Sequence, residues 1–387
     1  MKLLNYSVRN SFARKLTSIL TLVGISLVVF VFCAVLMLTN GLKTTLVATG
    51  SDDNGIIIRR SAQTEIVSIV NREMADVIKA DPGIARTADG KPYFTAEILV
   101  LINQNKRSNN EPSNVPVRGV SDMSLTIRPN VEITQGRMWR PGTSEIIAGR
   151  KVAETFQGCG LGETVRFGQR DWTIVGIFES GNNGFESELW GDVDQLMAAF
   201  ERPVFSSLTF RIDPSSSVQA ITERLENDPR LTISVMAEKE YYRLQSQTFT
   251  TFIMILGIFI SVLFSAGAVV GAMITMYAAV SNRTVEIGTL RALGFSRNQV
   301  LSAFLSEALI ISVVGGLIGV SMAALLQLVE VSTTNWDTFA EIAFSFKMSP
   351  FIALIAVLFS IVMGIIGGFL PAVRAARLNI ISALKAK

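Results

Sequence analysis

The side chains on which most enzyme mechanisms depend are scarce in this sequence. It contains no histidine, which excludes Ser-His-Asp and Cys-His catalysis and every metal site built on histidine. We interpret the two cysteines, Cys33 and Cys159, as free structural thiols, because Cys33 lies within a long apolar run. The sequence has no Gly-x-x-x-x-Gly-Lys-[Ser/Thr] phosphate loop, and no pair of carboxylates stands out. We therefore expect no catalytic residue, no metal site and no cofactor in this chain.

One short stretch, residues 282–300, is polar and basic although it lies between two long apolar runs. Ile287, Leu290 and Leu293 recur every third residue and would share one side of a short helix. Gly294 is expected to end that helix. The charged residues of the stretch are Arg283, Glu286, Arg291 and Arg297. Two interpretations stay open at this point: a solvated loop whose arginines only set membrane topology, or a docking element for a cytoplasmic partner.

Composition indicates a membrane protein that carries a sizeable soluble domain. The chain has 387 residues, of which 49% are hydrophobic and only 17% are charged. A net charge of +3 is too small to indicate binding to nucleic acid. Four apolar segments are long enough for the roughly 20 residues that a membrane helix needs. We predict transmembrane helices at residues 16–39, 248–280, 300–328 and 349–371.

The positions of the basic residues predict how these helices cross the membrane. Residues 1–15, which we expect to form a basic amphipathic helix or a disordered basic tail, contain no acidic residue. The link at 281–299 and the tail at 372–387 are also basic, whereas the short loop at 329–348 is net acidic. The positive-inside rule therefore places both termini and the basic link in the cytoplasm.

The region between the first two apolar segments, residues 40–247, has no run long enough to span a membrane. It shows a strand, a helix over 66–78 and an Asp-Pro pair, and a similar pattern follows after residue 207. If this repeat is not a coincidence, residues 50–114 and 205–237 form one α+β part. The fold class is then an α-helical membrane protein with four transmembrane helices and an α+β extracytoplasmic domain inserted between helices 1 and 2.

The middle of that region carries several short strand patterns. We predict that residues 115–204 form a β-rich insert, and that residues 103–116, rich in Asn, Ser and Pro, form a mobile loop. The glycines at 158–162 resemble a nucleotide loop only superficially, because no helix follows them, and we predict a turn there.

A few polar and small residues within the apolar segments predict helix contacts. Glu307 lies about two turns into the third segment, where a charge is costly. It is expected either to pair with an arginine of the preceding link or to reach the membrane surface. Three Gly-x-x-x-Gly pairs allow close approach of helices, within the bundle or between subunits. They are Gly267/Gly271, Gly315/Gly319 and Gly364/Gly368.

Several stretches are similar to known signatures. Residues 283–297 read Arg-Thr-Val-Glu-Ile-Gly-Thr-Leu-Arg-Ala-Leu-Gly-Phe-Ser-Arg, and residues 304–308 read Phe-Leu-Ser-Glu-Ala. Residues 370–378 read Leu-Pro-Ala-Val-Arg-Ala-Ala-Arg-Leu. These stretches resemble signatures of the MacB/FtsX family of ABC transporter permeases, and residues 117–119 and 172–176 resemble its extracytoplasmic domain. One departure is the segment 379–381, which lacks the family's usual proline.

The resemblance implies a permease of the bacterial inner membrane that works without chemistry of its own. It implies a homodimer or close heterodimer bound to two copies of a separate ATPase, which would hold ATP and Mg. ATP binding would move the extracytoplasmic domain through long helices, a mechanism called mechanotransmission. The missing phosphate loop agrees with a permease without a fused ATPase. The resemblance assigns ATPase coupling to Arg283, Glu286, Ile287, Leu290, Arg291, Leu293 and Gly294.

The resemblance leaves more than one function open. The first hypothesis is export or extraction of a substrate, for which a periplasmic adaptor, an outer-membrane channel and membrane lipid are candidate partners. The second is an FtsX-like signalling scaffold that activates cell-wall hydrolases, which the large outer region makes less favourable. The third is release of lipoproteins. A membrane-bound enzyme is the least supported reading, and the sequence does not identify a substrate.

Overall fold

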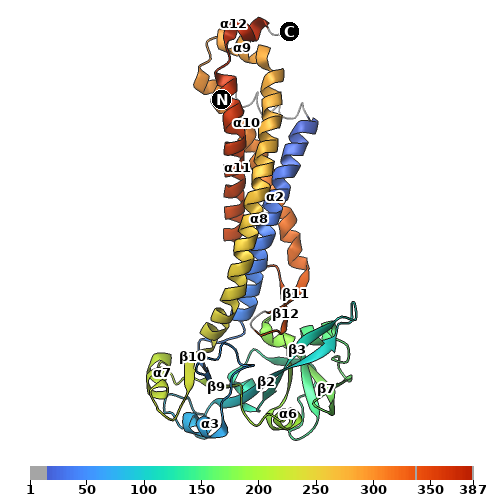
Figure 1. Ribbon diagram of the computed structural model, residues 1–387, viewed down its shortest axis with the longest axis vertical. Coiled ribbons are helices and arrows are strands. Elements are labelled where there is room, and N and C mark those ends of the chain that lie inside the picture. Colours follow the sequence, from blue (N-terminus) through green and yellow to red (C-terminus); the bar gives the residue numbers. More distant parts are fainter. Residues whose placement is uncertain (1–14, 336–337, 386–387) are drawn as a thin grey trace. The chain divides into compact units, whose positions relative to one another are not determined.

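The computed structural model describes residues 15–335 and 338–385, so the predicted N-terminal helix, Asp337 and Lys387 lie outside the described residues (Figure 1). The chain divides into two compact units. Unit 1 contains residues 15–40, Phe252–Val329 and the chain from Ser345 onward. Unit 2 contains Gly41–Thr251 and Glu330–Phe344. The divisions after Asn40 and Thr251 fall inside two long helices, so each of these helices contributes residues to both units.

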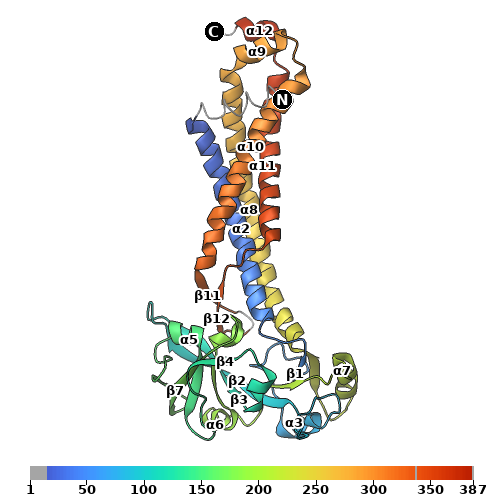
Figure 2. The same cartoon turned by 180° about the vertical axis from the view of Figure 1, so that it is seen from behind.

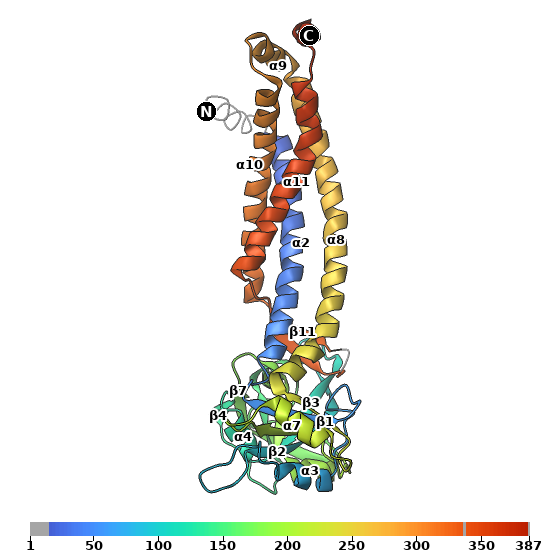
Figure 3. The same cartoon turned by 90° about the vertical axis from the view of Figure 1, so that its left-hand side faces the viewer.

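Unit 1 is built on long apolar helices that run side by side (Figures 1 and 3). Within the described residues, four helices have the length and composition needed to cross a membrane. They are α2 (Lys15–Val47), α8 (Glu238–Asn282), α10 (Arg297–Ala324), which a 3-10 turn η2 (Leu325–Leu328) extends, and α11 (Pro350–Ala376). Two short helices, α9 (Thr284–Ala292) and α12 (Ile380–Lys385), lie together at one end of this unit (Figure 1).

Local sequence explains where these helices begin and end. Ser296 and Gln299 form a capping box at the start of α10, each side chain bonding the other's backbone N–H. Ser349 caps α11, and Pro350 occupies its first turn, where a missing N–H costs nothing. Gly294 has a φ of +93°, a left-handed conformation that glycine adopts easily, and follows the last residues of α9. The prediction that Gly294 ends the short helix is confirmed.

Two of the three Gly-x-x-x-Gly pairs lie at helix contacts within unit 1. A Cβ at Gly319 would lie 2.6 Å from the Ser26 carbonyl oxygen of α2. A Cβ at Gly364 would lie 2.6 Å from the Cβ of Ser312 on α10, and one at Gly368 only 2.5 Å from that of Ala308. These glycines therefore let α10 approach α2 and α11 closely.

The glycines of α8 behave differently. Apart from the glycine itself, its chain neighbours and the nearby backbone of α8, no heavy atom of the described chain lies within 4 Å of a Cβ built at Gly267 or at Gly271. Of the two contacts that the sequence left open, packing within the bundle is therefore not used here. A close contact of α8 comes instead from Gly257, which faces Val35 of α2 and which the spacing did not identify.

Unit 2 is a mixed α/β domain around one large twisted sheet (Figure 2). Its strands are β1 (Asn54–Arg59), β2 (Phe94–Asn105), β3 (Pro112–Val120), β4 (Glu132–Gly136), β5 (Glu145–Gly149), β6 (Thr164–Phe167), β7 (Arg170–Glu179), β8 (Leu189–Asp192), β9 (Ser207–Arg211) and β10 (Ile233–Ala237). Its helices are α3 (Arg72–Lys79), α4 (Met123–Ile127), α5 (Arg150–Thr155), α6 (Val193–Ala199) and α7 (Val218–Glu226), with a 3-10 turn η1 (Gly184–Ser187). The strand order is β10-β1-β9-β2-β3-β8-β5-β7-β4, and β6 pairs with β7.

The long strand β2 joins the two parts that the sequence separated. Its first residues pair with β9, and its residues from Ile98 onward pair with β3. The predicted boundary at residues 114–115 falls inside β3, so the α+β part and the β-rich insert share one sheet. The predicted mobile loop at 103–116 is wrong, because only residues 106–111 lie between the two strands. Its polar residues belong to the exposed end of a β-hairpin, where no core selects apolar side chains.

Other details of unit 2 also differ from or agree with the predictions. The predicted helix over 66–78 begins only at Arg72, because the Asn71 side chain accepts a hydrogen bond from Met74 N and starts the helix there. The helix predicted after residue 207 is confirmed as α7, with Ser217 as its cap. The glycines at 158–162 form turns, as predicted.

The loop predicted at 329–348 contains a two-stranded hairpin of β11 (Glu330–Thr334) and β12 (Glu341–Ser345). Most of it belongs to unit 2, where Lys106 Nζ lies 2.6 Å from Glu341 Oε1. Asn114 Nδ2 donates to the Phe339 carbonyl at 3.0 Å, and Ala343 N donates to Ser187 Oγ at 3.3 Å. The sequence predicted a short loop here but not the hairpin within it, since partners distant in sequence give these residues their structure.

We predict that a side chain at Gly364 disrupts the contact between α10 and α11. Gly364→Val should destabilise the chain by about 1–3 kcal/mol, the usual effect of overpacking a close contact. The matched control is Gly24→Val in α2, where no heavy atom lies within 4 Å of the Cβ position. Thermal unfolding of both variants in detergent measures the difference. Equal losses in the two variants would contradict the assignment of a helix contact.

Candidate functional site

The predicted coupling segment consists of α9 and the turn that follows it, residues 283–297. Ile287 is buried in a small apolar cluster with Val280 of α8 and Phe304 of α10. Ala372 and Ala375 of α11 complete this cluster, and α12 packs directly against α9. One side of α9 is therefore fixed to the end of the helix bundle.

The opposite side of α9 is exposed. Glu286 is exposed and makes no ion pair with any residue that the structure describes. Leu293, which was expected to share a side with Ile287, is 73% exposed because it is the C-terminal cap and lies beyond the last full turn. Leu290 is half-buried, and Arg291 Nη1 donates to the Phe295 carbonyl at 3.2 Å, which holds the turn after the helix. The prediction that the three apolar residues form one side is wrong for Leu293.

A buried ion pair fixes the start of this segment. Arg283 Nη1 lies 3.2 Å from Glu307 Oε2 of α10, and both side chains are about nine-tenths buried. The prediction that Glu307 pairs with an arginine of the link is thus confirmed. The alternative prediction, that Glu307 reaches the membrane surface, is not confirmed. The pair borders a cavity of about 50 Å³. Thr21 of α2 and Thr275 of α8, whose hydroxyl groups lie 2.8 Å apart, also line it.

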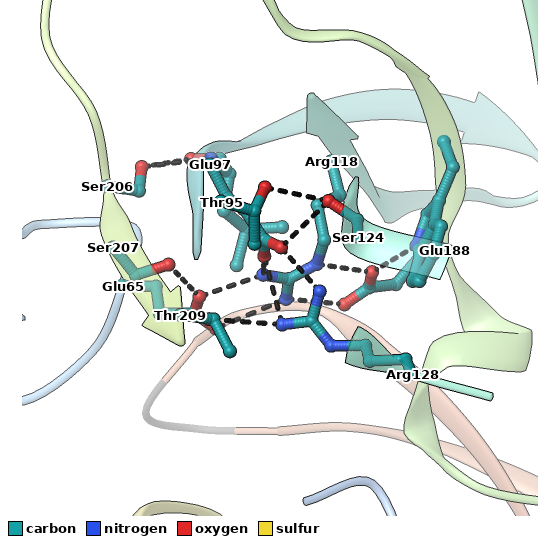
Figure 4. Close-up of polar contacts among 12 residues, drawn as sticks. Glu65, Thr95, Glu97, Arg118, Ser124, Arg128, Glu188, Ser206, Ser207 and Thr209 are labelled. Carbon is teal, nitrogen blue, oxygen red and sulfur yellow. Dashed lines mark hydrogen bonds and ion pairs between the residues drawn. The ribbon is translucent and has the colours of Figure 1, made fainter. Parts of the chain in front are cut away.

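Unit 2 contains a second charged site, which sequence reasoning missed (Figure 4). Two arginines and four glutamates are buried together in the core, and we call them the buried charge cluster. Its members are Arg118 of β3, Arg128 at the end of α4, Glu65, Glu97 of β2, Glu188 and Glu238, the first residue of α8. Figure 4 shows the two guanidinium groups lying close together among the carboxylates.

Arg118 uses all of its guanidinium donors within the cluster. Nη1 and Nη2 donate to the two oxygens of Glu65 at 2.8 and 3.1 Å. Nε and Nη2 donate to Glu188 at 2.7 and 2.9 Å, and Nη1 also reaches Glu97 at 2.9 Å. Two forked contacts of this kind fix the position of the planar guanidinium as well as its charge.

Arg128 joins the sheet to the start of α8. Its Nη1 and Nη2 donate to Glu97, and Nη2 also donates to Thr209 Oγ1 at 3.2 Å. On the other side, Nε and Nη2 donate to Glu238 Oε1 at 3.2 and 3.0 Å. The Phe185 ring lies beneath both arginines, with centroid distances of 4.8 Å for Arg128 and 5.4 Å for Arg118.

Burial and the neighbouring arginines shift the pKa values of the carboxyls in opposite directions. Burial raises the pKa of Glu188, although Arg118 and the Trp190 indole donate hydrogen bonds to it. Burial also disfavours ionisation of Glu65, but the charge and hydrogen bonds of Arg118 outweigh it and leave that pKa below its usual value. Glu188 therefore takes up a proton more readily than a solvated glutamate.

The cluster lacks the side-chain arrangement of a metal site. Among the described residues, no group of three or more His, Cys, Asp or Glu side chains could hold a metal ion. The carboxylate oxygens of the cluster accept hydrogen bonds from arginine and from Asn54, Ser207 and Trp190. What the arrangement can do is hold several distant segments in fixed positions.

Comparison with known families identifies the chain. Residues 18–228 match the MacB-like periplasmic core domain, and residues 258–380 match the FtsX-like permease C-terminal domain. The chain belongs to the MacB/FtsX-like family of ABC transporter permeases. The first match covers unit 2 almost up to α8, and the second covers the coupling segment and α11.

Relatives of this family align with different parts of the chain. The macrolide export ATP-binding/permease protein MacB of Neisseria meningitidis is 31% identical over 58% of this chain and 35% of that protein. The uncharacterized ABC transporter permease YknZ of Bacillus subtilis is 26% identical over 72% of each chain. MacB of Pasteurella multocida is 27% identical over 96% of this chain and 58% of its own length. The chain thus spans about a third of the length of the first of these relatives.

Two solved structures are similar in part to this chain. The periplasmic region of MacB from Actinobacillus actinomycetemcomitans is 13% identical with a TM-score of 0.37, and covers 53% of this chain and 94% of that one. The extracellular domain of YknZ from Gram-positive bacteria is 16% identical with a TM-score of 0.35, and covers 47% and 99%.

The sequence held only a weak signal for the buried charge cluster of this family member. Arg118 lies within the apolar strand pattern of β3, and Glu97 within that of β2. A charge inside an apolar strand is costly unless it is paired, so each position predicts a partner. The partners themselves come from segments more than twenty residues apart, which no local spacing can reveal.

We predict that the Arg283–Glu307 pair stabilises unit 1 only as a pair. Glu307→Leu should cost about 3–5 kcal/mol, because it leaves the Arg283 charge buried without a partner. The double variant Arg283→Met with Glu307→Leu should recover most of that loss. Glu286→Leu, at an exposed position in the same region, is the control. Thermal unfolding in detergent tests this, and a double variant as unstable as Glu307→Leu alone would refute it.

We predict that Glu188 makes the chain less stable as the pH rises. Since its pKa is raised in the folded chain, its contribution is full below the unfolded pKa of about 4.3 and is lost as the pH rises through the folded pKa. Glu188→Gln should therefore flatten the fall in unfolding temperature as the pH rises above the unfolded pKa of about 4.3. Glu145→Gln is the control, because Arg137 lowers the pKa of Glu145 to about 2. Equal pH slopes in the native chain and Glu188→Gln would contradict the prediction.

Proposed function

We propose that this chain is the membrane permease subunit of an ABC transporter, and that it couples ATP binding and hydrolysis by a separate ATPase to movements of unit 2. Helices α2, α8, α10 and α11 would cross the inner membrane, with both termini in the cytoplasm and unit 2 outside. The output would be export or extraction of a substrate. The family match and the four long apolar helices support this assignment.

The observation that carries the proposal is the two-sided character of α9. Its inner side is fixed to the bundle by Ile287 and by the Arg283–Glu307 pair. Its outer side exposes the charge of Glu286 together with the apolar side chains of Val285 and Leu293, which are 46% and 73% exposed. Apolar anchors beside a charge able to select its partner are the features of a specific protein interface. Movement of an ATPase docked there would be transmitted to α10 through the buried Arg283–Glu307 pair.

The proposed assembly needs partners that this chain would recruit. Two copies of the ATPase would supply the ATP and Mg sites, and two permease copies would form a homodimer or close heterodimer. The open side of α8 at Gly267 and Gly271 is a surface on which a second copy could pack. A periplasmic adaptor and an outer-membrane channel are further candidate partners for export, the activity that the name of the MacB relative states.

The two alternatives are a signalling scaffold for cell-wall hydrolases and a lipoprotein-releasing permease. Both would use the same coupling segment, so its geometry does not favour either over transport. The family matches do not support either alternative better than transport. Transport by mechanotransmission therefore stands as the proposal.

We predict that reversing the exposed charge of α9 weakens binding of the ATPase. Glu286→Arg should lower its co-purification from mild detergent by about tenfold, equivalent to roughly 1.4 kcal/mol of binding free energy. Glu73→Arg, the same change at an exposed position of α3 in unit 2, is the control. Quantitative pull-down and ATP hydrolysis by the purified complex are the measurements. Unchanged recovery and unchanged ATPase activity with Glu286→Arg would refute the docking role.

A further inference from the structure

The first residue of α8 is held on every side within unit 2. Glu238 is fully buried, and its Oε1 accepts two hydrogen bonds from Arg128. Its Oε2 accepts from Asn54 Nδ2 at 2.9 Å and from the Ser51 backbone N at 3.2 Å. One carboxylate thus connects α8 to β1, to the end of α4 and to the segment that follows α2.

The next turn of α8 is fixed in the same core. The Tyr241 hydroxyl accepts a hydrogen bond from the Glu65 backbone N at 3.0 Å. Tyr242 packs edge-on against Phe185, the ring that lies beneath both arginines, with centroids 6.1 Å apart. Both tyrosines are at most 5% exposed. Two successive turns of the helix therefore contribute side chains to the buried charge cluster and its aromatic neighbours.

The chain leaving α2 lies against the same turn of α8. A Cβ at Gly50 would lie 2.6 Å from the carbonyl carbon of Glu238 and from the Cα of Lys239, so only glycine fits there. Thr49 Oγ1 accepts a hydrogen bond from Gly184 N at 2.8 Å, which ties this segment to η1. The segment that follows α2 and the first turn of α8 therefore meet within unit 2 beside the buried charge cluster.

We infer that Arg118, Arg128 and Glu238 are positioning residues of a rigid joint, which makes the first turns of α8 move together with the sheet of unit 2. This inference rests on the proposed function, in which α8 carries movement to unit 2. Turning or sliding α8 against the sheet would break the bonds of Glu238 and leave Arg128 Nε without its acceptor in a region closed to water. A purely apolar contact could slide with little loss, whereas forked charged hydrogen bonds have one favourable geometry.

The composition of the cluster supports a role in geometry more than in stability. Buried ion pairs contribute little net stability, since well-packed apolar side chains of similar volume often do as well. Four carboxylates for two guanidinium groups is also a costly ratio inside a core. Such a group is better explained by the fixed orientation that it gives to the segments that meet there.

The joint can be tested by measuring one distance within unit 2 of the full chain, reconstituted with its ATPase in lipid nanodiscs. Spin labels are attached at Leu244→Cys on α8 and at Arg166→Cys on β6, both exposed positions, and the labelled chain is diluted with unlabelled permease so that only distances within one copy are recorded. The native cysteines do not interfere, because Cys33 and Cys159 are buried and burial raises the pKa of Cys159 to about 12. The test variant is Glu238→Gln, whose amide would oppose the donors of Asn54 and Ser51.

Glu240→Gln is the matched control, since it removes the same charge from the same turn but from an exposed pair with Arg243. We expect one narrow distance distribution, unchanged by ATP, in the native chain and in Glu240→Gln. Glu238→Gln should at least double the width of the distribution and make it respond to ATP. If Glu238→Gln does not fold, Arg128→Lys, which keeps the charge but loses the fork, should give an intermediate width.

A narrow distance distribution in both Glu238→Gln and Arg128→Lys would overturn the inference of a rigid joint. So would an ATP-dependent shift of this distance in the native chain, which would mean that α8 hinges at the cluster. Failure of the proposed function would give a different result, because no ATPase would assemble with the native chain or with any variant. The widths of the distance distributions measured without nucleotide would still show whether the cluster forms a rigid joint.

Discussion

A guanidinium group buried in a protein core must find acceptors for all of its N–H donors, because water is not there to replace them. Arg118 finds them on three glutamates, and Arg128 shares one of these and adds Glu238. The rest of unit 2 depends on this requirement. It brings together β2, β3, the turn after β1, the segment before β8 and the first turn of α8, which are far apart in the sequence. A core of this kind satisfies all of its hydrogen bonds in only one arrangement of these segments. That fixed arrangement is what α8 needs if it is to carry movement to unit 2.

In unit 1, too, a buried charged group needs a partner, here within a single ion pair. Arg283 and Glu307 are each too costly to bury alone, so each fixes the other, and together they fix the start of α9 to α10. Close contacts at Gly319 and Gly364 allow α10 to pack tightly against α2 and α11. Force applied to α9 would then reach several long helices at once. The proposed function needs both features: an input that is fixed to the bundle and an output that is fixed to the sheet.

The sequence predicted best what local physics decides. Apolar length indicated four long helices, the left-handed preference of glycine ended α9 at Gly294, and the cost of a buried charge predicted a partner for Glu307. Prediction from the sequence failed where the structure of a segment depends on partners that are distant in the sequence. β2 reads as polar at its end because that end is exposed, and the hairpin of β11 and β12 gains its structure from unit 2. The buried charge cluster escaped notice for the same reason: its partners are joined by the fold and by no local spacing.

In the proposed function, ATP binding by an ATPase docked on α9 moves unit 2. The most direct measurement is the distance between single spin labels at Arg166→Cys in the two permease copies of the assembled complex, with and without a non-hydrolysable ATP analogue. We expect the distribution to shift when the analogue binds, and the shift to disappear with Glu286→Arg. An unchanged distribution in a complex that binds the analogue and hydrolyses ATP would contradict it.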